Sequence, residues 1–84
     1  MTSVQIYSRP GCHLCDEMKA VVERLAHSMP LAIEEIDIST DPELERRYGL
    51  EIPVLVIDGT KVAKYRIAEG TLRRMLTARA RGAC

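Results

Sequence analysis

The hydrophobic residues of this chain follow helical spacing in two separate stretches. In each stretch, apolar side chains recur at i, i+3 and i+4, so that they share one face of a helix. The two apolar stripes consist of Met18, Val21, Val22 and Leu25, and of Leu72, Met75 and Leu76. They predict one helix that begins near Leu14 and ends at the break over 27–30, and a last helix that runs to Gly82.

Four other stretches have the apolar runs, or the alternation of apolar and polar residues, that favour β-strands. They cover residues 4–7, 31–38, 53–57 and 60–66. The adjacent pair Glu34 and Glu35 interrupts the alternation in the second strand, so we expect this strand either to lie at an edge of the sheet or to begin late. Asp58 and Gly59 predict a tight hairpin between the last two strands, which then pair antiparallel.

A short helix is predicted between the second and third strands, and two overlapping start signals fit it. In one, Asp41 is the N-cap and Pro42 occupies the first helical position. In the other, Thr40 is the N-cap and Glu43 completes a capping box. Gly49 is well placed to end the helix in a left-handed conformation. The residues of this helix expected to face the core are Leu44 and Tyr48.

The predicted order of elements is β-α-β-α-β-β-α. The first βαβ crossover is expected to be parallel and right-handed, and the hairpin adds two antiparallel strands to the same sheet. We therefore predict an α/β fold with a four-stranded mixed sheet flanked by three helices, which cover both faces. Residues 1–84 are expected to form one domain, because no linker, repeat or low-complexity tract divides them.

The composition narrows the classes of partner. Twelve basic residues balance twelve acidic ones, so no net charge recruits nucleic acid or an acidic membrane surface. The chain has no Trp, no Phe and three Tyr, and it therefore lacks the aromatic platforms of single-strand binders. Its first residues do not resemble a secretory signal, and its longest aliphatic run, 54–57, is far too short to span a bilayer. We expect a monomeric, cytoplasmic protein with no nucleic-acid or membrane partner.

The candidate chemistry lies in Cys12-His13-Leu14-Cys15, a C-x-x-C motif at the point where the first loop becomes a helix. A helix N-terminus stabilises a thiolate through unpaired N–H groups and the positive end of the helix dipole, and comparable cysteines have pKa values lowered to roughly 3.5–7.5. Arg9 is expected to add a nearby positive charge. Cys15 lies nearly one turn further along the same helix face, where it is better shielded. We therefore predict that Cys12 attacks a disulfide and that Cys15 resolves the mixed disulfide.

A disulfide across a two-residue spacer gains little loop-closure stabilisation, roughly 2 kcal/mol, which suits a bond that is repeatedly reduced. Two other uses of the cysteine pair remain open at this point. One alternative is a metal or iron–sulfur module that uses Cys12 and Cys15. The sequence has no second C-x-x-C or H-x3-5-H pair to complete a four-ligand zinc site, so no metal ligands are predicted. The other alternative is a redox-responsive binding domain, in which the state of the disulfide controls a partner.

Pro53 opens the third predicted strand and cannot donate an amide hydrogen bond to the sheet at that point. The peptide bond between Ile52 and Pro53 can be cis or trans, and these residues alone do not decide between the two. A cis bond would turn the Ile52 backbone outward, where its N–H and C=O are able to pair with an extended disulfide substrate.

Residues 6–15, Ile-Tyr-Ser-Arg-Pro-Gly-Cys-His-Leu-Cys, and residues 52–59, Ile-Pro-Val-Leu-Val-Ile-Asp-Gly, resemble the glutaredoxin-like branch of the thioredoxin superfamily. The likeness spans almost the whole chain. It implies a thioredoxin fold, dithiol–disulfide exchange at Cys12 and Cys15, and a cis-proline at Pro53 beside them.

The same resemblance implies how a substrate is bound. Arg9 occupies the place where glutaredoxins often carry a Lys that interacts with glutathione, and Ile52 matches the residue whose backbone holds the substrate. The implied partners are a protein or small-molecule disulfide and a thiol or flavoprotein reductant. No cofactor is expected to be bound, and glutathione is a candidate co-substrate.

The chain departs from the glutaredoxin pattern at two places. Its motif is Cys-His-Leu-Cys, whereas glutaredoxins commonly have Cys-Pro-Tyr-Cys. Residues 65–71 replace the Gly-Gly-x-Asp-Asp segment that binds glutathione in that family. The sequence therefore leaves open whether glutathione or a thioredoxin-reductase-type enzyme is the electron donor.

Two further residues each have a functional and a neutral interpretation. A protonated His13 would stabilise the Cys12 thiolate or move protons during exchange; otherwise it is a solvated residue of the first helical turn. Cys84, at the end of the chain, is a resolving thiol or an intermolecular link in one interpretation and has no role in the other.

Overall fold

The computed structural model describes residues 2–82, and their strands form one four-stranded sheet. The strands are β1 (Thr2–Ser8), β2 (Leu31–Asp37), β3 (Val54–Ile57) and β4 (Thr60–Lys64). They lie in the order β2-β1-β3-β4, with β1 parallel to β2, and with β3 antiparallel to both β1 and β4. Asp58 and Gly59 have φ of 49° and 84°, as the predicted two-residue hairpin requires. The mixed sheet, the element order and the edge position of β2 confirm the predicted fold class.

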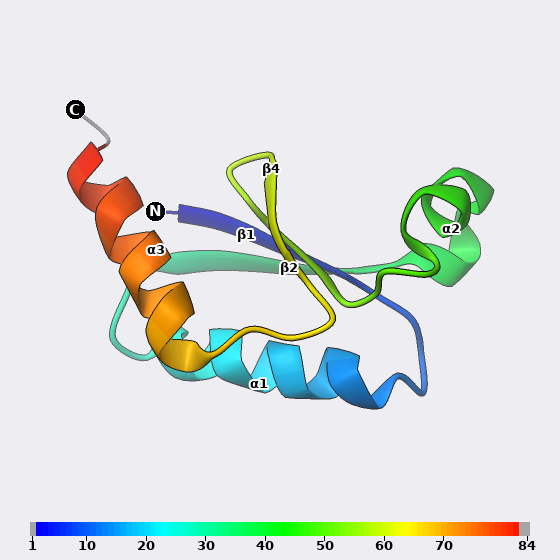
Figure 1. The fold of residues 1–84 in the computed structure, drawn as a ribbon, viewed down its shortest axis with the longest axis horizontal. Coiled ribbons are helices and arrows are strands. Elements are labelled where there is room, and N and C mark those ends of the chain that lie inside the picture. Colours follow the sequence, from blue (N-terminus) through cyan, green and yellow to red (C-terminus); the bar gives the residue numbers. More distant parts are fainter. Residues whose placement is uncertain (1, 83–84) are drawn as a thin grey trace.

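Three α-helices pack around the sheet: α1 (His13–Ala26), α2 (Pro42–Tyr48) and α3 (Glu69–Gly82). Figure 1 shows α1 and α3 next to each other on one side of the strands, whereas α2 lies at the far end. A one-turn 3-10 helix, η1 (Ile38–Thr40), joins β2 to α2 and is not evident from the sequence pattern. No helix within residues 2–82 combines the length and the apolar content that crossing a membrane requires.

The hydrophobic core lies between the sheet and the helices α1 and α3. The antiparallel register sets Val4 opposite Ile57 and Ile6 opposite Leu55. These four side chains therefore share the face that the two helices cover. Both predicted apolar stripes contribute to the same core, through Met18, Val22, Leu25, Leu72 and Leu76. This packing gives the first turn of α1 a fixed place at the carboxyl end of β1.

The start of α2 follows the first of the two capping alternatives. Asp41 is the N-cap, and its carboxylate accepts hydrogen bonds from the amides of Glu43 and Leu44. The end of α2 differs from the prediction. Gly49 has a right-handed conformation, with φ −55°, because its N–H continues the helical bonding to the Glu45 carbonyl at 2.8 Å.

The prediction that Leu44 and Tyr48 face the core is wrong, because no side chain of α2 is buried. Tyr48 instead stacks its ring on that of Tyr7, with the two centroids 4.6 Å apart. Tyr7 alternates with the buried Ile6, so its ring lies on the face of β1 that α1 does not cover. The helix α2 thus contacts the second face of the sheet only near Tyr7. The prediction that helices cover both faces therefore overstates the coverage of this face.

Candidate active site

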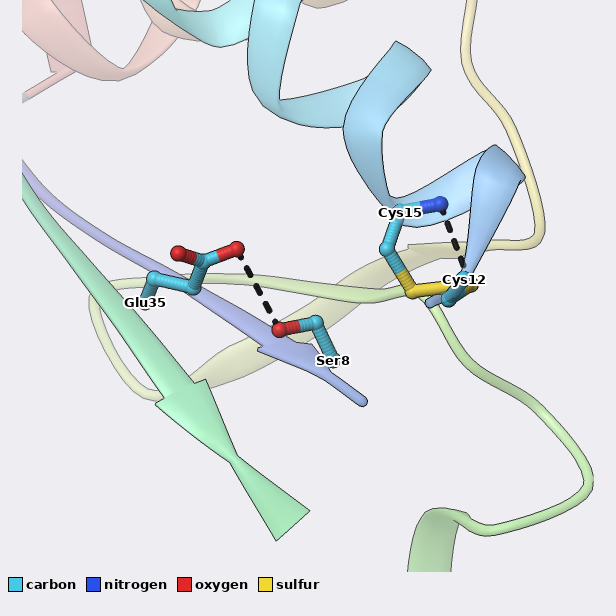
Figure 2. Close-up of a disulfide and its surroundings, with 4 residues drawn as sticks. All are labelled: Ser8, Cys12, Cys15 and Glu35. Carbon is cyan, nitrogen blue, oxygen red and sulfur yellow. Dashed lines mark hydrogen bonds between the residues drawn. A yellow bond between two sulfur atoms is a disulfide. The ribbon is translucent and has the colours of Figure 1, made fainter. Parts of the chain in front are cut away.

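The loop between β1 and α1 places Cys12 at the start of the helix. Gly11 has φ +79°, a left-handed conformation that favours glycine, and the Cys12 N–H donates to the Arg9 carbonyl at 3.2 Å. Cys12 is the N-cap of α1, with an extended backbone. Its Sγ accepts a hydrogen bond from the Cys15 amide at 3.2 Å (Figure 2). A helix N-terminus that directs an N–H group at a sulfur atom stabilises negative charge on it.

The two cysteines of the motif are joined in a disulfide and differ in exposure. The Cα atoms of Cys12 and Cys15 are 5.2 Å apart. Cys12 is half-buried, whereas Cys15 is only 2% exposed. Cys12 is therefore the more accessible residue of the pair.

A cavity of about 320 Å³ lies beside Cys15, at the ends of β1 and β2, and its walls include Ser8, Lys19, Glu35 and Asp37. Glu35 accepts hydrogen bonds from the Ser8 hydroxyl at 3.3 Å and from Lys19 Nζ at 3.2 Å. Figure 2 shows Ser8 and Glu35 on neighbouring strands next to the disulfide. The hydrogen bond to Glu35 raises the pKa of Lys19. The cavity thus connects a buried sulfur with a carboxylate that a hydroxyl and an ammonium group hold in place.

Glu35, Ser8 and Lys19 are site residues that the local sequence pattern does not reveal. The parallel register pairs Glu35 with Ile6, so its side chain lies on the face that α1 covers. The sequence does contain one indication: Glu35 is two residues from the apolar Ile33, so the two side chains point to the same face of β2. That signal becomes meaningful only once the pairing of β2 with β1 is known.

The two polar residues predicted to serve Cys12 do not contact its sulfur. The Arg9 guanidinium binds both carboxylate oxygens of Glu45 on α2. His13 is the exposed first residue of α1. Within residues 2–82, no hydrogen bond links either side chain to the Cys12 sulfur. Any role of Arg9 in substrate binding therefore competes with its ion pair to Glu45.

The antiparallel register sets Val54, the first residue of β3, opposite Tyr7 on β1, so the segment that leads into β3 lies at the end of the sheet where β1 continues into the Cys12 loop. Its Ile52–Pro53 peptide bond is cis. Pro53 is buried, Ile52 is half-buried, and the Pro53 carbonyl accepts the N–H of Tyr65 at 2.8 Å. The fold thus brings this segment and the C-x-x-C motif, which are far apart in the sequence, to one end of the molecule.

Two other features of the sequence concern Cys84 and metal binding. Cys84 lies outside the residues that the structure describes. Across residues 2–82, no three side chains of His, Cys, Asp or Glu are grouped so that they could hold a metal ion.

Known proteins resemble this chain in both sequence and fold. Residues 3–77 match the family described as Glutaredoxin-like domain (DUF836). A thioredoxin of Methanocaldococcus jannaschii is 34% identical over 59 residues, which cover 67% of this chain and 69% of that protein. The solved structure of protein XcR50 from X. campestris has a TM-score of 0.75 and 32% identity, and the match covers 89% of this chain and 96% of XcR50. Protein Ne2328 from Nitrosomonas europaea has a TM-score of 0.76 and 28% identity, and the match covers 88% and 89% of the two chains.

Proposed function

We propose that this chain, which belongs to the Glutaredoxin-like domain family, is a dithiol–disulfide oxidoreductase that works through Cys12 and Cys15. Its thioredoxin-like fold and its disulfide point to thiol–disulfide redox chemistry. The M. jannaschii relative is named thioredoxin, which supports the same chemistry. One observation carries the proposal: the Cys12 sulfur caps α1, accepts the Cys15 amide, and is bonded to a partner sulfur that is buried.

Cys12 makes the first attack in the reduced protein. The Cys15 amide and the dipole of α1 stabilise its thiolate form, which is the nucleophile of disulfide exchange. The thiolate bonds to one sulfur of the substrate disulfide and forms a mixed disulfide. The other substrate sulfur leaves as a thiolate and takes a proton from water.

Cys15 completes the exchange. It loses its proton and attacks the Cys12 sulfur, so that the second substrate sulfur leaves as a thiolate. Two electrons have then passed to the substrate, which becomes two thiols, and the protein holds the disulfide seen in Figure 2. Because Cys15 is buried, it does not compete with Cys12 for the substrate.

The Cys15 proton leaves through the cavity beside it. A buried thiol has no direct contact with bulk water, but a cavity of about 320 Å³ has room for water molecules. Glu35 lies in the wall of this cavity, held by Ser8 and Lys19. Its carboxylate accepts the proton, directly or through one water molecule, and passes it to solvent.

The substrate class includes disulfides of proteins and of small molecules. An extended polypeptide pairs with the Ile52 backbone as an added strand, because the segment that carries Ile52 lies at the same end of the sheet as the Cys12 loop. A thiol such as glutathione, or a flavoprotein, supplies the electrons that regenerate the dithiol. Arg9 is available to an anionic thiol only when its ion pair with Glu45 opens.

Replacement of each cysteine tests the proposal. Pre-reduced protein is mixed with bis(2-hydroxyethyl) disulfide, and the released thiol is measured. We expect Cys12→Ser to lose roughly a hundredfold or more in rate, because it lacks the nucleophile. We expect Cys15→Ser to stop at a mixed disulfide that mass spectrometry detects. Cys84→Ser is the matched control and should react like the parent; a Cys12→Ser protein that reacts as fast as the parent contradicts the proposal.

A further inference from the structure

Tyr65 follows β4 with φ +70°, in the left-handed region that residues with a Cβ rarely adopt. The other non-glycine residue with positive φ in residues 2–82 is Asp58, which lies in the hairpin turn, where Asp is common. A glycine in place of Tyr65 would not carry this strain. A large aromatic residue is therefore expected here only if its side chain makes interactions that offset the strain.

Two hydrogen bonds connect Tyr65 to both ends of the segment 50–53. Its N–H donates to the Pro53 carbonyl at 2.8 Å. Its hydroxyl donates to the Leu50 carbonyl at 2.9 Å. A single residue thus spans the segment that leads into β3 at the end of the sheet where the Cys12 loop begins.

The Glu51 N–H donates to the Tyr48 carbonyl at 2.8 Å and ties the segment to α2, but apart from Tyr65 few contacts tie the segment to the sheet. Leu50 is 93% exposed, so its side chain contributes almost no burial. Glu51 forms an ion pair with Lys61 at 2.9 Å; the two side chains are partly exposed, and pairs that solvent reaches are usually weak. Lys64 Nζ lies 5.6 Å from the centroid of the Tyr65 ring and helps to hold that ring. The Tyr65 hydroxyl is therefore a main restraint on the Leu50 end of the segment.

We propose that Tyr65 is a positioning residue for polypeptide substrates, because it holds the segment 50–53 in the shape in which the Ile52 backbone pairs with an extended chain. This inference rests on the proposed oxidoreductase function and adds a residue that acts on disulfides within polypeptides and not on small disulfides. A small disulfide needs the two sulfur atoms alone, and its reduction is indifferent to Tyr65. An extended chain needs a preformed strand edge, so a looser segment binds it less well.

Single-turnover reactions of the reduced protein compare the two substrate classes. One substrate is bis(2-hydroxyethyl) disulfide. The other is a pair of unstructured ten-residue peptides joined by a disulfide, with a fluorophore on one peptide and a quencher on the other. Each substrate is varied in excess over the protein, which yields a half-saturating concentration and a maximal rate. No external reductant is required, because the dithiol of Cys12 and Cys15 supplies both electrons.

Two substitutions of Tyr65 test the inference. Tyr65→Phe keeps the ring and removes the bond to Leu50, and we expect the half-saturating peptide concentration to rise about threefold to tenfold. Its maximal rate, and its rate with the small disulfide, should stay within about twofold of the parent. Tyr65→Gly also relieves the backbone strain. Its half-saturating peptide concentration should rise as much as that of Tyr65→Phe, and its melting temperature should not be lower than that of Tyr65→Phe. Tyr7→Phe, which removes a tyrosine hydroxyl from β1, is the matched control and should match the parent with both substrates.

Two outcomes overturn the inference: an unchanged half-saturating peptide concentration in Tyr65→Phe, or an equal loss of rate with both substrates. Failure of the proposed function has a different signature, because the parent itself would then reduce neither substrate. If the parent reduces both substrates and Tyr65→Phe behaves like the parent, Tyr65 has no positioning role, and the proposed oxidoreductase function is unaffected.

Discussion

The Ser8 hydroxyl on β1 donates to the Glu35 carboxylate on β2 at 3.3 Å, where the two parallel strands end beside the disulfide (Figure 2). Among residues 2–79, whose burial the structure describes, Ser8 is the one buried polar side chain, and buried hydroxyls need a partner. The bond satisfies that need and keeps a carboxylate in the wall of the cavity next to Cys15. A shift of β2 by one residue would turn Glu35 to the other face of the sheet, so the strand register determines whether this carboxylate is available.

Replacing Glu35 with Gln should slow the resolving step. Glutamine has the same size and can still accept the Ser8 hydrogen bond, but it is not a base. We expect release of the second substrate thiol to slow about tenfold near neutral pH, with the first release unchanged. Stopped-flow mixing of the reduced variant with a chromogenic aromatic disulfide separates the two releases.

Glu34→Gln is the matched control for Glu35→Gln. Glu34 is the neighbouring carboxylate on β2, and it accepts a hydrogen bond from Gln5 Nε2 at 3.1 Å on the opposite face of the sheet. It should leave both releases unchanged. If both variants slow the second release equally, the effect arises from lost negative charge and not from proton transfer to Glu35.

Replacing Glu45 with Gln should release Arg9 for an anionic thiol. The Arg9 guanidinium binds both oxygens of Glu45, and the neutral amide competes less well for it. We expect the KM for glutathione in a glutathione-reductase-coupled assay to fall about twofold to fivefold. Glu43→Gln, which removes a carboxylate paired with Arg46 on the same helix, should leave it unchanged. A KM that does not move in Glu45→Gln would show that Arg9 ties the loop to α2 and does not bind glutathione.

Truncating a core leucine should destabilise the protein far more than truncating an exposed one. Leu55 on β3 is completely buried, so Leu55→Ala should lower the free energy of unfolding by about 2–5 kcal/mol. Leu50→Ala removes the same atoms from a side chain that is 93% exposed, and it should change that free energy by no more than about 0.5 kcal/mol. Urea unfolding followed by circular dichroism measures both values. Similar losses in the two variants would contradict the burial that the fold assigns to these leucines.

Asp37 should make the stability depend on pH in the acid range. Hydrogen bonds from the hydroxyl and the amide of Ser39, with a smaller contribution from the Arg9 charge, lower the pKa of Asp37 below its usual 3.8. A carboxyl whose pKa is lower in the folded state stabilises the fold above its unfolded pKa, and this contribution is lost as the pH falls through the folded pKa. Asp37→Asn should therefore flatten the dependence of the unfolding free energy on pH below about 4, as urea titrations at several pH values would show. Ser39→Ala should flatten it in part; an unchanged profile in Asp37→Asn would mean that other carboxyls dominate the acid limb.

Features that depend on neighbouring residues are predictable from the sequence. The hairpin at Asp58 and Gly59 is one example, because two residue types that tolerate positive φ suffice to form the turn. The start of α2 near Pro42 is another, because N-cap side chains bond amides two and three residues further on; the sequence left Asp41 and Thr40 as alternative caps, and the structure has Asp41. The burial of Leu44 is not predictable in this way, because the short helix α2 extends from the end of the sheet and its apolar side chains do not reach the core.

Some features of the candidate site are also predictable from neighbouring residues, whereas others depend on the tertiary structure. The placement of Cys12 and Cys15 in one helical turn is evident from their spacing alone. The engagement of Arg9 by Glu45 is not, because 36 residues separate the two in the chain. Tyr65 belongs to no recognisable motif, and its left-handed backbone and its bond to Leu50 appear only in three dimensions.

Local patterns along the chain were enough to identify the elements, their order and the C-x-x-C pair at the start of α1, because turns, caps and helical spacing act over a few residues. Strand register and packing between distant segments settled the rest, which includes the carboxylate beside Cys15, the partner of Arg9 and the restraint on the segment before β3. The physical reason is that a side chain's neighbours across a sheet depend on how separate strands align, and that alignment reflects the energy of the whole core.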